Sequence, residues 1–93
     1  MPYIEQEIRK ILQPTITNVI NALRKLGVDN RAGNLNYTIC TILNALYPND
    51  RYREFNDMMG LLDCIAREMY RKRVAPYEDK AITKNGDIFN EST

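Results

Sequence analysis

The chain contains no histidine, and this absence removes most of the usual catalytic arrangements. An activated serine or cysteine nucleophile needs a neighbouring proton acceptor of suitable pKa, which is most often an imidazole. A zinc site built from cysteine and histidine is excluded for the same reason. The sequence also lacks both common glycine-rich phosphate loops, GxxxxGK[ST] and GxGxxG. These absences favour a binding protein over an enzyme, with no cofactor and no bound metal.

Cysteine is scarce, and neither sign of charge is in large excess. Cys40 and Cys64 lie in predicted helices without CxxC spacing, so we expect reduced thiols that serve packing and not redox chemistry. Lysine and arginine number 13 against 12 aspartates and glutamates, which gives a formal net charge of +1. Because no global positive field attracts phosphates, a nucleic-acid partner is disfavoured, even for the basic run at 71–73.

Long hydrophobic runs are absent as well. The N-terminus has no positive segment followed by an apolar one, so it does not resemble a secretory signal. The longest uncharged stretch, residues 32–49, is rich in asparagine and threonine, unlike a membrane span. We therefore expect a protein that is neither secreted nor inserted in a membrane.

The apolar residues that are present recur every three to four positions, which predicts an all-α fold. A length of 93 residues fits one domain, near the lower limit for a core that needs no disulfide or metal. We expect a compact bundle of about four helices with a long C-terminal helix over 1–76. A polar tail at 77–93 would follow, with a turn at 85–87 and a loose end.

Prolines, glycines and an asparagine mark the expected helix boundaries. Pro14 is expected to end or kink the first helix, and Gly27 to cap the second at its C-terminus. Asn34 is placed to cap the third helix, and Pro76 is expected to stop the fourth. The predicted helices cover 2–14, 15–26, 34–47 and 51–74.

The longest predicted helix carries a continuous apolar stripe. Leu61 and Cys64 lie beside that stripe, and Asp63 is the one charged residue between positions 58 and 66. A helix that is apolar around much of its circumference is central in its domain or shared with another subunit. We therefore predict a homo-oligomer, dimer or larger. The stripe consists of Phe55, Met58, Met59, Leu62, Ile65, Ala66 and Met69.

A polar sector of arginine and tyrosine flanks this stripe when the helix is projected at about 100° per residue. Arginine binds phosphate through two hydrogen bonds, and tyrosine offers a ring for stacking, so the sector suits a small anion or a nucleotide. Its glycine would let a ligand approach closely. The predicted ligand-binding residues are Asn56, Gly60, Arg67, Tyr70 and Arg71.

Three alternatives stand beside this site. Asp63 with Arg67, and Glu68 with Lys72, are spaced for ion pairs on a solvated helix face. Glu54 and Asp57 could hold a divalent metal or act as acid and base, although exposed charges are the commoner outcome. A second cluster lies near the start of the helix, and an antiparallel helix dimer would bring it to the basic run at 71–73. This cluster consists of Tyr47, Arg51, Tyr52 and Arg53.

Several short segments resemble an uncharacterised family of short proteins from bacterial and phage genomes. They are the opening MPYI, the central GNLNY from Gly33, and APYEDK from Ala75 with the NGD that begins at Asn85. The family more often has aspartate where this chain has Asn34. The resemblance implies a phage or mobile-element protein in the host cytoplasm, and it carries over no catalytic residue.

The leading hypothesis is a helical homo-oligomer that sequesters a small anionic or nucleotide ligand without altering it, as counter-defence sponges of phages do. The alternative is an adaptor or inhibitor that docks a host or phage protein through an apolar groove. Met58, Met59 and Met69 would supply an adaptable surface for that partner.

Overall fold

The computed structural model describes residues 1–89, and every regular element in that range is helical. Residues 90–93, where a loose end is predicted, lie outside it. Three helical runs replace the predicted four, because the first run covers both helices predicted at 2–14 and 15–26. The third run continues for 34 residues from Tyr52. None of the described helices is long and apolar enough to cross a membrane. The elements are α1 (Gln6–Lys25), α2 (Arg31–Leu46), α3 (Tyr52–Met69), the π-helix η1 (Tyr70–Val74) and α4 (Ala75–Asn85).

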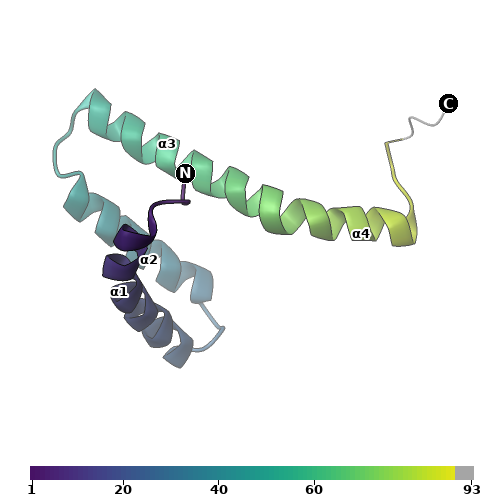
Figure 1. The fold of residues 1–93 in the computed structure, drawn as a ribbon, viewed down its shortest axis with the longest axis horizontal. Helices are drawn as coiled ribbons and strands as arrows, with labels where there is room; N and C mark the ends of the chain where they lie inside the picture. The colour runs from purple at the N-terminus through teal and green to yellow at the C-terminus, as the bar shows by residue number, and fades with distance from the viewer. Residues whose placement is uncertain (90–93) are drawn as a thin grey trace. The chain divides into compact units, whose positions relative to one another are not determined.

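The chain divides into two units, residues 1–58 and residues 59–93. In the first unit, α1 and α2 form a helical hairpin and lie side by side (Figure 1). In the second unit, η1 leads directly into α4. The division of the chain into a bundle at 1–76 and a tail at 77–93 stays a prediction.

Helix α1 runs through Pro14, so of the two predicted alternatives, an end or a kink at this residue, the end is wrong. The apolar positions explain this continuity. Ile8, Leu12, Ile16 and Ile20 are spaced by four residues on both sides of the proline, so one face of the helix persists across it. On the exposed side, the Gln13 amide donates a hydrogen bond to the Thr17 hydroxyl at 3.2 Å, which spans the same turn.

Helix α2 begins at Arg31, three residues before the boundary predicted at Asn34. Asn30 precedes it in a left-handed conformation with φ of 62°, and its carbonyl accepts the Asn34 N–H at 2.9 Å. Asn34 therefore does not cap the helix. Its own carbonyl accepts the Thr38 hydroxyl at 2.8 Å inside α2. The predicted end near Tyr47 is confirmed within one residue.

The helix end predicted at Pro76 is also wrong. The Ala75 N–H donates to the carbonyl of Tyr70, five residues earlier, which is the hydrogen bond of a π-helix. Pro76 then falls in the first turn of α4, where a missing N–H costs nothing and the fixed φ of proline suits a helix. The π turn therefore lets the chain stay helical until Asn85, after which Gly86 leaves the helix with φ of 96°.

No residue in the described part of the chain is buried, which is the main departure from the compact bundle that the sequence predicts. Val19 and Leu23 on α1 and Leu43 on α2 are half-buried where the hairpin closes. Leu62, in the middle of the apolar stripe, keeps 37% of its surface exposed, and Met69 keeps 55%. Within residues 1–89, neither unit has a closed hydrophobic core.

Gly27 has φ of 81° directly after α1, and its N–H bonds to the carbonyl of Arg24 at 3.0 Å, so the predicted glycine cap is confirmed. Gly27→Ala should lower the free energy of unfolding by about 1 kcal/mol, since a β-carbon is strained in this conformation. Gly33→Ala is the matched control. Gly33 lies inside α2 with open space at the β-carbon position, so alanine should stabilise by about 0.5 kcal/mol or more. Urea unfolding at one fixed protein concentration measures both, and equal effects would contradict the assignment.

Candidate ligand-binding site

Arg67 on α3 is held by an acidic neighbour on the same helix. Its Nε donates to Asp63 Oδ2 at 2.8 Å, and the two side chains are 78% and 61% exposed. This hydrogen bond and the negative charge of Asp63 raise the pKa of the guanidinium above its ordinary value. The predicted i,i+4 ion pair is therefore confirmed. Because an exposed pair of this kind contributes little stability, an incoming anion can exchange for it.

Arg71 on η1 pairs with Glu68 on α3, three residues earlier, through Nη2 and Oε1. The sequence predicted Lys72 as the partner of Glu68, four residues on. The change of helix type accounts for the difference, because the regular projection at about 100° per residue ends with α3 at Met69. Arg67 and Asp63 keep the predicted sector, whereas Tyr70 and Arg71 follow the wider π turn.

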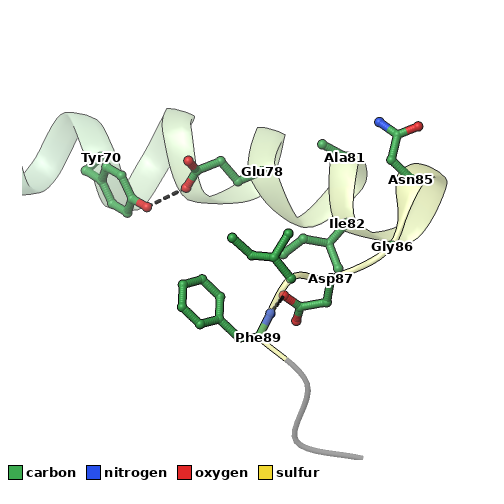
Figure 2. Close-up of a pocket in the computed structure, with 9 residues that line it drawn as sticks. Tyr70, Glu78, Ala81, Ile82, Asn85, Gly86, Asp87 and Phe89 are labelled. Atoms are coloured by element: carbon green, nitrogen blue, oxygen red, sulfur yellow. Dashed lines mark hydrogen bonds between the residues drawn. The ribbon is translucent and has the colours of Figure 1, made fainter.

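Tyr70 contacts α4, a connection that helical spacing did not predict. Its hydroxyl donates a short hydrogen bond to Glu78 Oε1, and the ring points toward that carboxylate (Figure 2). This bond, together with the charge of Glu78, raises the pKa of the phenol above 10.0. Tyr70 is thereby oriented by α4 and not by the sector of arginines. The sequence shows Glu78 as a possible acceptor, but only the π turn places its carboxylate within reach of the Tyr70 hydroxyl.

A pocket of about 390 Å³ lies between Tyr70, α4 and the segment that follows α4 (Figure 2). Phe89 and Ile82 supply apolar surface. Two carboxylates line the pocket, those of Glu78 and Asp87, and the lining contains no lysine or arginine. The Oδ1 atom of Asp87 already accepts a hydrogen bond from the Phe89 N–H at 2.9 Å. A phosphate inside this pocket would be repelled, so an anion is better placed at Arg67 and Arg71.

Glu78→Gln should return the pKa of Tyr70 toward 10.0, because the charged acceptor is removed. In the native chain the folded state holds the phenol proton more tightly than the unfolded state does. The contact therefore stabilises the fold below pH 10, and this stabilisation is lost as the pH rises through the raised pKa. A carbon-13 tyrosine NMR titration, with Tyr70→Phe for assignment, measures the shift.

Asp79→Asn is the control for this titration, because Asp79 contributes the smallest effect on Tyr70. It should leave the Tyr70 pKa nearly as high as in the native chain. Equal shifts in the two variants would contradict the direct hydrogen bond.

Gly60 and Asn56 complete the predicted site on α3. Open space surrounds the position that a β-carbon would take at Gly60, so the structure leaves room for a ligand there. Asn56 belongs to the part of α3 in the first unit, whereas the other four predicted residues belong to the second. Arg67 and Arg71 are therefore the two cations of the predicted site that belong to a single unit.

The second cluster surrounds the connection between α2 and α3. Tyr47 follows the last turn of α2 and is half-buried, while Arg51, Tyr52 and Arg53 are exposed. Sequence reasoning missed the contact of Glu54, whose Oε1 accepts the Asn49 N–H at 3.1 Å and so joins the first turn of α3 to the loop before it. Cys40 on α2 and Cys64 on α3 are free and exposed. Within residues 1–89, no three cysteine, aspartate or glutamate side chains lie close enough together to hold a metal ion.

The fold and the exposed arginines define a small all-helical protein whose polar groups lie on open helix faces. The chain belongs to the family described as a domain of unknown function, DUF6899, whose model matches residues 1–88. This agrees with the uncharacterised family that the sequence segments resemble, whereas the phage or bacterial source stays a prediction. No curated protein and no solved structure matches the chain.

Proposed function

We propose that this protein is a non-enzymatic, phage or mobile-element protein that assembles into a helical homo-oligomer and sequesters a small anionic or nucleotide-type ligand in the host cytoplasm. The proposal rests first on the absence of any buried residue among residues 1–89. Most of the stability of helices in proteins comes from packing an apolar face against other residues. Further copies of the chain would cover these faces and complete the core.

Arg67 and Arg71 support an anionic ligand. Both guanidinium groups are well exposed and lie within one turn of each other along the chain. Each guanidinium group already hydrogen-bonds to a carboxylate oxygen. A phosphate oxygen that replaced the carboxylate would bind the guanidinium group in the same way. Tyr70, at 52% exposure between them in sequence, offers a ring for stacking on a base. Because the ligand would only replace the carboxylates as partners of the two arginines, capture needs no covalent chemistry.

The test is to purify the protein from cells that produce a nucleotide immune signal, heat it, and analyse the released small molecules by mass spectrometry. We expect an intact nucleotide, and a raised melting temperature when a cyclic nucleotide or an ADP-ribose derivative is added to the stripped protein. Empty protein together with no thermal shift would overturn ligand capture. A modified product in place of the intact nucleotide would overturn the non-enzymatic assignment.

A second candidate function is an adaptor that docks another protein, and a groove in the first unit favours it. The groove measures about 390 Å³, lies between α1 and α2, and is mostly apolar. Leu26 and Tyr37 at its rim are well exposed, so an amphipathic helix could dock there. The lining residues are Val19, Ala22, Leu23, Leu26, Asn34, Tyr37 and Thr38.

A further inference from the structure

We infer that α3 pairs with α3 of a second copy, and that the two helices run antiparallel. The inference rests on the homo-oligomer of the proposed function and adds which face is shared and in which direction. It is carried by two independent features of α3, the spacing of its exposed apolar side chains and the distribution of its charges.

The first feature is a seam with alternating spacing of three and four residues. This is the spacing of paired helices, in which each apolar side chain packs between side chains of the facing helix. Four of the five seam residues keep more than a third of their surface exposed, and Met58 is half-buried. The seam therefore has apolar surface available for a second helix. Its residues are Phe55, Met58, Leu62, Ile65 and Met69.

The second feature is a charge asymmetry along α3 and η1. Residues 52–63 contain three acidic side chains and one basic one, Arg53, a net charge of −2. Residues 67–73 contain four basic side chains and one acidic one, a net charge of +3. Paired helices lie about 8–10 Å apart, which is close to one Debye length at physiological salt. Parallel pairing would place like charges together, whereas antiparallel pairing places each acidic segment beside a basic one.

These two features together fix a register. The seam residues occupy two alternating positions of the repeat, Phe55, Leu62 and Met69 at one and Met58 and Ile65 at the other. In antiparallel pairs, a residue at one position lies opposite a residue at the other position of the facing helix. Leu62 then faces Ile65 of the second copy, and Met58 faces Met69. Glu54 comes level with the basic run at 71–73 of that copy. The Arg51 cluster of one chain thereby approaches the Arg71 cluster of the other, so the anion site would be shared between two chains.

Cysteine cross-linking tests the direction without any ligand. In a background of Cys40→Ala and Cys64→Ala, we would make Met58→Cys, Met69→Cys and the variant with both substitutions. Antiparallel pairing places position 58 opposite 69 but roughly 16 Å from position 58 of the other copy, at about 1.5 Å per residue. That distance exceeds what a disulfide spans. We therefore expect covalent dimers from the combined variant and from an equal mixture of the two single variants, and none from either alone.

Circular dichroism would check that each variant keeps its helix content. If the variant with both substitutions does not fold, the mixture of the two single variants replaces it in the test. Covalent dimers from each single variant by itself would overturn the inference in favour of parallel pairing. Oligomers that cross-link in no combination would overturn α3 as the shared face and leave the proposed homo-oligomer standing. A chain that is monomeric before oxidation would overturn both.

Discussion

Replacing Ile65 by aspartate is expected to dissociate the protein and to remove most of its helical signal. Losing a packed isoleucine side chain costs about 2–5 kcal/mol, and an unpaired carboxylate in an apolar seam adds several more. A small protein has only about 5–15 kcal/mol of stability in total. Since no residue among 1–89 is buried within one chain, the seam is an apolar surface that association can cover. Sedimentation equilibrium and far-ultraviolet circular dichroism measure the two effects.

Cys64→Asp is the matched control, because Cys64 is the adjacent residue, is exposed and lies off the seam. It introduces the same carboxylate into the same turn of α3. We expect this variant to remain assembled and helical. If Ile65→Asp stayed assembled to the same extent as the control, the seam would not be the surface that holds the copies together.

Reversing both arginine charges, with Arg67→Glu and Arg71→Glu, is expected to weaken capture of a nucleotide by roughly a hundredfold or more. Each charged hydrogen bond is worth about 1.5–3 kcal/mol, and about 1.4 kcal/mol is a factor of ten in affinity. Asp63→Asn should act in the opposite direction, because it releases Arg67 from its 2.8 Å ion pair. Isothermal titration with cyclic nucleotides and ADP-ribose measures both variants.

The control for charge is Lys80→Glu with Lys84→Glu, which makes the same change in net charge on α4. Capture should survive there, since neither lysine belongs to the proposed site. The same variants separate the two candidate functions. An adaptor that docks through the groove between α1 and α2 would keep its protein partner after the arginine reversal. Loss of nucleotide capture in both double variants alike would indicate a general effect of charge and would contradict a specific site.

Helical periodicity predicted most of the secondary structure but misplaced the boundaries that depend on proline. The four-residue spacing of Ile8, Leu12 and Ile16 already crosses Pro14, and giving that periodicity more weight than the proline would have predicted α1 correctly. Pro76 is a harder case. Its tolerance depends on the π turn before it, and a π turn leaves no recognisable pattern in a single sequence.

The candidate site was predictable only where α3 stays regular. The contact between Asp63 and Arg67 follows from their spacing, and the structure has it. The contact between Tyr70 and Glu78 joins η1 to α4 across eight positions, so no rule for neighbouring helix turns could supply it. The sequence also predicted a compact bundle, because periodicity identifies an apolar face but not the chain that covers it.

The molecular mass of the native chain in solution tests the central claim most directly, namely that other copies of this chain cover its apolar helix faces. Sedimentation equilibrium over a range of protein concentrations should give an integral multiple of 10.8 kDa. Helix content should fall as dilution separates the copies. A single species of 10.8 kDa that remains fully helical at every concentration would contradict the account.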